Sequence, residues 1–403
     1  MHNYREIVKN VYYVGADDHK IDKFEGIIPL SRGVSYNSYL LKDKKNCLMD
    51  TVDQAVARQF IENIDALLKG EKLDYLVVLH MEPDHCYNIE QVLLRHPETK
   101  VVGNEKTFTF ISNFFPNLDL TDKKIVVNEN DELDLGVHKL KFIFAPMVHW
   151  PEVMIAFEEK EGLLFSADAF GMFNTLDGNL YADNVDFDRD YLDEARRYYT
   201  NIVGKYGMQV VSLFKKVTDL KIKMILPLHG FIWRKNIEYI LNKYTLWATY
   251  TSEVKSVLII YASMYGDNAC CANILANKLS MQNINDIKVL DASMVDATFL
   301  VSESFKYSNI VIISPTYNMT IFPSIEIYLD DMLRMGLKNR TISLIENGSW
   351  APNAKSLIKA KLDNSKLPFN FTETSLTIKS SLKEDDEKII DKMVEEIKNS
   401  LND

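Results

Sequence analysis

The sequence predicts an α/β protein built from two halves of different rhythm. In residues 1–250 short strands mix with few helices, whereas in residues 254–403 strands alternate with helices in five βα units. That alternation is typical of a doubly wound, five-stranded parallel sheet. A chain of 403 residues is long enough for two or three domains. We therefore predict one domain over 1–250 and a second over 254–403, meeting at the short junction Tyr250–Lys255.

Short apolar runs between polar turns mark the elements of the first half. The predicted elements are the strands Tyr36–Leu41 and Asn46–Asp50, the helix Ile61–Leu68, the strand Leu73–Leu79, the hairpin strands Val153–Phe157 and Leu163–Ala167, and the strand Met224–Leu228. Three of these strands run directly into a histidine or an aspartate, namely His80, Asp168 and His229.

The second half begins with the strand Val257–Tyr261 and ends with a helix whose apolar stripe runs from Ile389 to Leu401. Between them lie the strands Ile287–Leu290, Ile310–Ser314 and Thr341–Ile345, and a fifth strand near Ser375–Ile378.

Charge and cysteine content exclude several classes of protein. The chain has 46 Lys and Arg against 57 Asp and Glu, so we expect no nucleic-acid partner. Its four cysteines form no C-x-x-C pair, which excludes zinc-ribbon and rubredoxin-type iron sites. No apolar run approaches the roughly 18 residues that cross a bilayer. With free thiols and no signal-peptide pattern at the start, we expect a cytoplasmic protein without a membrane segment.

The segment after the strand Leu73–Leu79 carries the strongest chemical signal. It reads His80-Met81-Glu82-Pro83-Asp84-His85, with four possible metal ligands within six residues. His149, Asp168 and His229 also follow apolar strands. The remaining histidines, His2, His19, His96 and His138, lie in polar segments and are expected at the surface.

Four histidines and three carboxylates are too many ligands for one four-coordinate ion. They suit two ions, which two-metal sites hold roughly 3.5–4 Å apart. Asp168 is the natural bridge, because it comes from a separate strand and offers two oxygens. Mixed imidazole and carboxylate ligands favour iron over zinc.

This layout resembles the metallo-β-lactamase fold, an αββα sandwich whose usual motif is H-x-H-x-D-H. Glu82 makes the motif H-x-E-x-D-H, which resembles the signature of the flavodiiron proteins. By resemblance, one iron would take His80, Glu82 and His149, the other Asp84, His85 and His229, and Asp168 would bridge them. In some family members the histidine at the position of His85 turns away from the metal. Several members also carry a histidine in the segment matching residues 23–26, which this chain lacks.

Three loops of the second half predict a flavin site. The loop after Val257–Tyr261 feeds a helix N-terminus, where backbone N–H groups can hold a phosphate, and it resembles the flavodoxin phosphate loop. Two further loops follow neighbouring strands, at the edge where a flavodoxin-like fold holds the FMN ring. The predicted FMN residues are Ser263, Met264, Tyr265, Gly266, Asp267, Asn268, Ser314, Pro315, Thr316, Tyr317, Asn318, Asn347, Gly348, Ser349 and Trp350.

The resemblance implies a flavodiiron oxidoreductase with FMN and two non-haem irons as cofactors. Electrons would pass from a rubredoxin-like donor through FMN to the diiron site, which reduces dioxygen to water or nitric oxide to nitrous oxide. No catalytic residue is expected beyond the metal ligands. The resemblance also implies a head-to-tail homodimer, or a dimer of dimers, with the flavin of one chain beside the diiron site of the other.

Two other function classes fit parts of the sequence. A dizinc hydrolase of the metallo-β-lactamase type would carry the flavodoxin-like half as an appendage, but Glu82 and the FMN loops argue against it. A flavin- and metal-binding sensor would hold the same cofactors without turnover.

Overall fold

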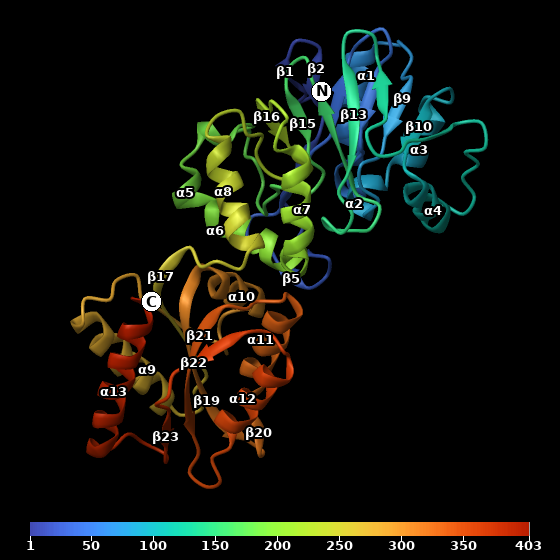
Figure 1. Cartoon of the computed structure of the whole chain (residues 1–403). Helices are drawn as coiled ribbons and strands as arrows, with labels where there is room; N and C mark the ends of the chain where they lie inside the picture. The colour runs from blue at the N-terminus through green and yellow to red at the C-terminus, as the bar shows by residue number, and fades with distance from the viewer. Residues whose placement is uncertain (403) are drawn as a thin grey trace. The chain divides into compact units, whose positions relative to one another are not determined.

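The computed structural model describes residues 1–402, which form two compact units (Figure 1). Unit 1 comprises Met1–Tyr199 and Met208–Tyr244, and unit 2 comprises Thr200–Gly207 and the described residues from Thr245 on. The short segment Thr200–Gly207 thus belongs with the second unit although it lies more than 40 residues before the predicted junction Tyr250–Lys255. Among the described helices, none combines the length and the apolar character that crossing a bilayer requires.

Unit 1 contains two large sheets. One has the order β1-β2-β7-β8-β9-β10-β11 and the other the order β12-β13-β14-β15-β16. Their strands are β1 (Arg5–Val8), β2 (Val11–Tyr13), β7 (Tyr39–Leu41), β8 (Cys47–Met49), β9 (Tyr75–Val77), β10 (Lys100–Gly103), β11 (Lys124–Val126), β12 (Glu132–Asp134), β13 (Lys139–Phe144), β14 (Met154–Glu158), β15 (Leu163–Phe165) and β16 (Met224–Leu226). Two small pairs, β3 (Ala16–Asp18) with β6 (Val34–Tyr36) and β4 (Lys23–Phe24) with β5 (Ile28–Pro29), complete the strands.

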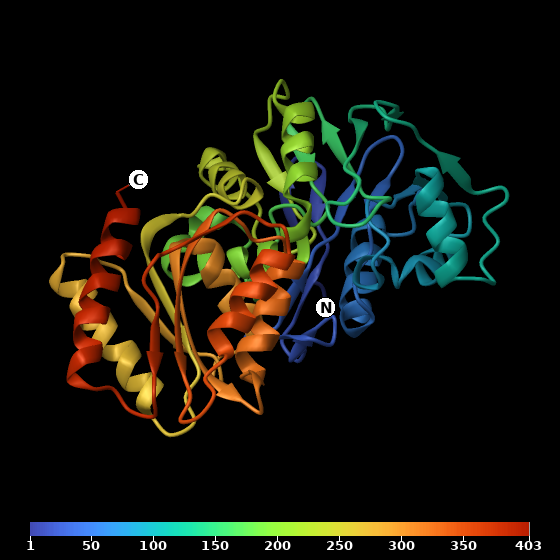
Figure 2. The same cartoon turned by 60° about the horizontal axis from the view of Figure 1, so that its bottom comes forward.

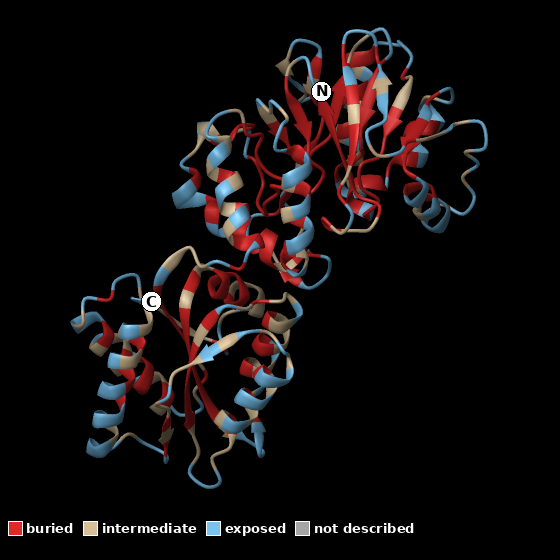
Figure 3. Cartoon of the chain, viewed as in Figure 1, coloured by how far each residue is buried: buried red, intermediate tan, exposed pale blue. Residues whose placement is uncertain are grey.

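Helices connect the parallel strands of both sheets. Strands β8 to β11 are parallel neighbours, as are β15 and β16, and parallel strands need crossover connections, here made by helices. The helices of this part of the chain are α1 (Ala57–Leu68), α2 (Pro83–Cys86), α3 (Ile89–Arg95), α4 (Glu105–Phe114), α5 (Phe187–Asp190), α6 (Leu192–Tyr198), α7 (Gly207–Val217) and α8 (Ile237–Ala248). The strands are largely buried, whereas the outer faces of the helices are exposed (Figure 3).

The prediction of one continuous strand over Tyr36–Leu41 is wrong. Strand β6 ends at Tyr36 and β7 begins at Tyr39, and between them the side chains of Asn37 and Ser38 donate hydrogen bonds to backbone carbonyls. The Asn37 amide donates to the carbonyls of Pro227 and Gly230, at 2.9 and 2.8 Å. This break places Asn37 beside the end of β16, where the site lies.

Unit 2 is a parallel sheet of the order β18-β17-β19-β21-β22, with the short β23 also beside β21. The strands are β17 (Val254–Tyr261), β18 (Lys288–Asp291), β19 (Tyr307–Tyr317), β20 (Thr320–Ile321), β21 (Arg340–Asn347), β22 (Phe369–Phe371) and β23 (Leu376–Ile378). Numbered by their order in the chain, these five strands lie in the sheet in the order 2-1-3-4-5, the flavodoxin-like order. The predicted doubly wound sheet is confirmed, with its fifth position divided between β22 and β23.

Helices cover both faces of this sheet (Figure 2). They are α9 (Asp267–Met281), α10 (Ala297–Lys306), α11 (Pro323–Arg334), α12 (Ala354–Asn364) and α13 (Glu384–Ser400). On one face α9 and α13 pack on the strands through a buried cluster that includes Leu275, Ile259, Val311 and Met393. The apolar stripe predicted for the last helix supplies Ile390, Met393, Val394 and Ile397 to that cluster.

Candidate functional site

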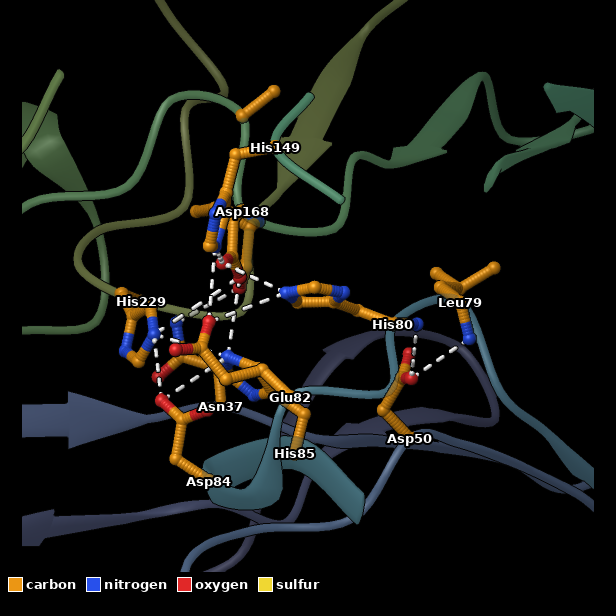
Figure 4. A network of polar contacts seen from close by, with 12 residues as sticks. Asn37, Asp50, Leu79, His80, Glu82, Asp84, His85, His149, Asp168 and His229 are labelled. Carbon is orange, nitrogen blue, oxygen red and sulfur yellow. Dashed lines mark hydrogen bonds and ion pairs between the residues drawn. The ribbon is translucent and has the colours of Figure 1, made fainter. Parts of the chain in front are cut away.

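Seven side chains converge at the ends of the strands of unit 1 (Figure 4). His80 and Glu82 follow β9, Asp84 and His85 lie on the one-turn helix α2, His149 lies between β13 and β14, and Asp168 and His229 follow β15 and β16. They form two groups, each with one ligand atom per residue within 4.8 Å of the others. The first cluster is His80, Glu82, His149 and Asp168, and the second cluster is Asp84, His85 and His229. All seven predicted metal ligands are therefore brought together.

Asp168 lies between the clusters. Its Oδ2 is 3.1 Å from His149 Nε2 and 3.5 Å from His80 Nε2, whereas its Oδ1 is 3.1 Å from His85 Nε2. One carboxylate thus presents a different oxygen to each cluster, which is the arrangement of a bridging ligand.

The polar atoms of these residues fit metal ions better than they fit one another. His85 Nε2 and His229 Nε2 are 3.0 Å apart, and two bare nitrogen lone pairs facing each other repel unless a proton or a cation lies between them. Both oxygens of Asp84 and Oδ1 of Asp168 are buried without a hydrogen-bond partner in the described part of the chain. Buried charges in proteins are paired or bind metal ions, and this mixed donor set suits iron.

Without a metal ion, the histidines and carboxylates of the two clusters attract one another, and this shifts their pKa values. Burial alone would lower the pKa of His149, but hydrogen bonds to Asp168 and Glu82 raise it to about 9. Burial alone would likewise lower the pKa of His85, but the charges of Asp84 and Asp168 raise it to about 9. Burial works against ionisation of Asp168, yet the charges of His85 and His80 hold its pKa well below the usual range. The groups therefore form an internally paired network of buried charges.

Two residues outside the predicted ligand set, Asp50 and Ser35, position two of the ligands through hydrogen bonds. Asp50, at the end of β8, accepts hydrogen bonds from the backbone N–H groups of Leu79 and His80, at 2.8 and 3.2 Å. His229 Nδ1 donates to the backbone carbonyl of Ser35, at 2.7 Å, so its Nε2 faces the second cluster. Asp50 ends an apolar strand just as Asp168 does, a signal that the sequence offered.

A carboxylic acid of the segment 23–26 borders the first cluster. Glu25, at the tip of the β4–β5 hairpin, forms a hydrogen bond with Glu82. Desolvation and the charge of Glu82 raise the pKa of Glu25 to about 7. The side chain that borders the first cluster at this point therefore titrates near neutral pH.

Aromatic rings enclose the clusters. The rings of Phe24, Tyr36 and Tyr198 lie 5.6, 5.7 and 5.5 Å from the ring of His229, and Trp150 lies 5.4 Å from His80. This apolar wall limits access of water to the site.

Unit 2 holds a cavity of about 280 Å³ at the carboxyl ends of β17, β19 and β21. Its lining is Ser263, Met264, Tyr265, Asp267, Asn268, Pro315, Thr316, Asn318, Met319, Asn347, Gly348, Ser349, Trp350 and Ser380. Of the predicted flavin residues, Gly266, Ser314 and Tyr317 do not line it. Gly266 has a φ of 103° just before α9, a backbone conformation that side chains disfavour. Met319 and Ser380 line the cavity without having been predicted.

Hydrogen bonds between the loops shape this cavity. Asn347 Nδ2 donates to Asn268 Oδ1 at 3.0 Å and to the carbonyl of Ser380 at 2.9 Å. Thr316 Oγ1 accepts from the backbone N–H of Asn353, which leads into α12. These side chains tie the three loops together, while Tyr265 and Trp350 are 92% and 72% exposed and free to cover a flat ligand.

One further expectation is wrong. His138 is buried, and its Nδ1 lies 3.1 Å from Oε1 of the buried Glu158 at the far end of β14. The charged residues Asp134, Lys139 and Lys141 nearby in the sequence suggested a surface position for a side chain that points into the fold.

Comparison with known proteins gives consistent relatives. A family model described as "ODP family beta lactamase" matches residues 34–230. An uncharacterised protein of Methanocaldococcus jannaschii is 32% identical over 328 residues, 80% of each chain. The anaerobic nitric oxide reductase flavorubredoxin of Aliivibrio salmonicida is 30% identical over 366 residues, which cover 88% of this chain and 71% of that one.

Solved structures share the fold over the whole chain. The rubredoxin oxygen:oxidoreductase of Desulfovibrio gigas matches with a TM-score of 0.92 at 23% identity, covering 99% of both chains. The flavodiiron protein of Giardia intestinalis matches with a TM-score of 0.93 at 24% identity, covering 100% of this chain and 98% of that one. The predicted fold class, a β-lactamase-like sandwich followed by a flavodoxin-like sheet, is confirmed.

Proposed function

The chain belongs to the flavodiiron protein family of oxidoreductases, and from this premise we propose that it reduces dioxygen to water or nitric oxide to nitrous oxide. The proposal includes a rubredoxin-like electron donor, FMN in unit 2, two irons in unit 1 and a cytoplasmic location. Both gases are small and uncharged, and the donor set suits either.

The observation that carries the proposal is the division of the seven buried ligands into two clusters that share Asp168. His80, Glu82 and His149 would hold one iron, and Asp84, His85 and His229 the other. Glu82 supports iron over zinc, because a carboxylate at this place adds a hard anionic ligand to the imidazoles.

Bound iron would supply redox chemistry and open coordination positions, and bound FMN would supply the electrons. The protein's own part is to orient the metal ligands and to exclude water from the site. Ser35 fixes the ring of His229, and Asp50 fixes the backbone at His80. The aromatic rings beside His80 and His229 would limit the access of bulk water to the site. Glu25, beside Glu82, is placed to hold a proton near the first cluster.

Turnover of each gas, added to protein that has been reduced under anaerobic conditions, tests the proposal. The protein, loaded with FMN and iron and given reduced rubredoxin, should consume dioxygen, nitric oxide or both, while an Asp168→Ala variant should keep its flavin spectrum and lose both iron and turnover. Elemental analysis should find about two irons per chain in protein from iron-replete cells. Two zincs, no consumption of either gas and hydrolysis of lactams or thioesters would favour the dizinc hydrolase instead.

Assembly as a head-to-tail dimer is part of the same proposal. Exposed apolar side chains line the cavity of unit 2, namely Met264, Tyr265, Met319 and Trp350. A surface of this kind supports burial against another chain. In a symmetric dimer the same contact forms twice.

Two inactive variants test whether electrons cross between chains. Asp168→Ala should keep its flavin, and Gly266→Asp should keep its iron while bulk and charge exclude the phosphate. A mixed dimer of the two pairs one intact flavin with one intact iron site on opposite chains. It should regain up to about half of the wild-type activity per dimer. Mixed dimers that form, as differential tags report, and stay inactive would refute this assembly.

A further inference from the structure

The two clusters differ in what lies behind their histidines. His80 Nδ1 is 2.8 Å from Oε1 of Glu152, and both side chains are fully buried. His229 Nδ1 faces the neutral backbone carbonyl of Ser35 instead. His85 Nδ1 has no partner in the part of the chain that the structure describes. A carboxylate is therefore hydrogen-bonded to a histidine of the first cluster, whereas neither histidine of the second cluster has such a partner behind it in the described structure.

Glu152 is held firmly in place. Its Oε1 also accepts the backbone N–H of Met81, at 2.9 Å, and its backbone carbonyl accepts from the side chain of Asn104, at 2.6 Å. Asn104 is in turn the N-cap of α4. Glu152 lies three residues after His149, so a single loop supplies one ligand of the first cluster and supports another.

The geometry fixes the tautomer of His80. A carboxylate only accepts hydrogen bonds, so Nδ1 of His80 keeps a proton toward Glu152, and Nε2, which faces Glu82 and Asp168, is the nitrogen that would give up its proton to ligate a metal ion. A carboxylate behind a ligating imidazole also raises its basicity, and such partners change metal affinity by about 10–100-fold.

We propose that Glu152 is a positioning residue that makes the first cluster the tighter of the two metal sites. The first cluster combines Glu82, its share of Asp168 and the charge of Glu152, whereas the second has Asp84 and its share of Asp168. One ion then loads first, and is removed last, at His80, Glu82, His149 and Asp168. The inference rests on the proposed function only in requiring that metal ions occupy both clusters.

The chain supplies a matched control. Glu158 is equally buried and also faces a histidine, with its Oε1 3.1 Å from Nδ1 of His138. It is the last residue of β14, whereas Glu152 precedes that strand. Glu158 Oε2 also accepts the backbone N–H of Glu161, at 2.8 Å, while Glu152 Oε2 has no partner among the described residues. Replacement by glutamine therefore disturbs local hydrogen bonding more at Glu158 than at Glu152, so Glu158→Gln is a stringent control for non-specific destabilisation.

Ferrous iron is the probe. Metal-free full-length wild type, Glu152→Gln, Glu158→Gln and Asp84→Asn are loaded anaerobically and dialysed against increasing concentrations of a competing chelator, and iron per chain is measured. Wild type should lose its ions in two separate steps. Glu152→Gln should weaken the more resistant ion about 10–100-fold. Glu158→Gln should match wild type, and Asp84→Asn should lose the weaker step and keep the resistant one.

Three results would overturn the inference: Glu152→Gln retains iron like wild type, Glu152→Gln and Glu158→Gln lose it alike, or Asp84→Asn loses the resistant ion. The last result decides even when Glu152→Gln does not fold, because Asp84→Asn leaves Glu152 in place. Gas consumption is not the readout. A wild type that loads two ions stepwise yet reduces neither gas would therefore refute the proposed function and leave this inference standing.

Discussion

Replacement of Asn37 by alanine tests how the second cluster is built. Asn37 is fully buried, and its amide donates to the carbonyls of Pro227 and Gly230, on either side of His229 (Figure 4). Its backbone N–H donates to the carbonyl of Leu228, at 2.8 Å. The side chain thus clamps the loop that carries His229.

The magnitude follows from these contacts. Alanine leaves the Gly230 carbonyl without its donor, which costs about 1–3 kcal/mol, whereas the Pro227 carbonyl keeps the hydroxyl of Tyr39 at 2.7 Å. A small cavity adds to that cost. The free energy of unfolding of unit 1 should fall by about 2–4 kcal/mol, and His229 should lose its fixed place beside Asp84 and His85.

Asn63→Ala is the matched control. Asn63 on α1 is equally buried, and its amide donates to the Val14 carbonyl at 2.9 Å and to Asn3 Oδ1 at 2.6 Å. Urea unfolding should show a similar loss in both variants, whereas chelator resistance of the weaker iron should fall only in Asn37→Ala. Wild-type iron retention in Asn37→Ala, or an equal iron loss in Asn63→Ala, would refute the clamp.

Three further outcomes are expected. Arg340→Met should lower the free energy of unfolding of unit 2 by about 3–5 kcal/mol. The reason is that the buried guanidinium donates to several backbone carbonyls, including that of Phe305 at 2.7 Å. A change below about 1 kcal/mol, measured by urea unfolding, would contradict this. Tyr198→Phe should raise Tm by about 2–4 °C, since it removes a buried hydroxyl without a partner in the described structure; a lower Tm would show that the hydroxyl is bound. In the metal-free protein the pKa of His85 and of His149 is raised to about 9, so their stabilisation is present below about pH 6.5 and lost as the pH rises through 9. Urea unfolding should therefore show metal-free protein less stable at pH 9.5 than at pH 6.5, by about 3 kcal/mol for each of the two histidines, and metal-loaded protein nearly unchanged. Equal stability of the metal-free protein at the two pH values would refute the pairing.

The metal ligands could be predicted because their signal is local. Each of His80, Asp168 and His229 lies within a few residues of the end of an apolar strand, and strand ends of neighbouring strands meet at one edge of a sheet. Polar side chains at such an edge are easily recognised along the sequence. The same logic identified the loops around Asn268 and Asn347 in unit 2, where the cavity is found.

The supporting residues could not be predicted because their partners are distant in the sequence. Glu152 meets His80 across 72 residues, and Asn37 meets Pro227 across 190. Nothing in the residues next to Asn37 reveals that its amide leaves the strand to clamp a loop. His138 shows the same limit, since its partner Glu158 lies 20 residues further along the chain, at the end of β14.

The negative charge of the buried carboxylates can be balanced either by protons on the histidines or by metal ions. Glu82, Asp84 and Asp168 place three carboxylates in a buried space, and Glu152 stands behind them. Buried anions need cations close by. In the metal-free chain protons on the histidines supply that charge, which is why the pKa of His85 and of His149 is raised. Ligation needs those imidazoles neutral, so metal binding must release protons as it delivers positive charge. A histidine at position 82 would remove one anion, and the remaining carboxylates would balance less of the charge of two ions. Glu82 therefore does more than distinguish one motif from another, because it sets how much positive charge the site can hold.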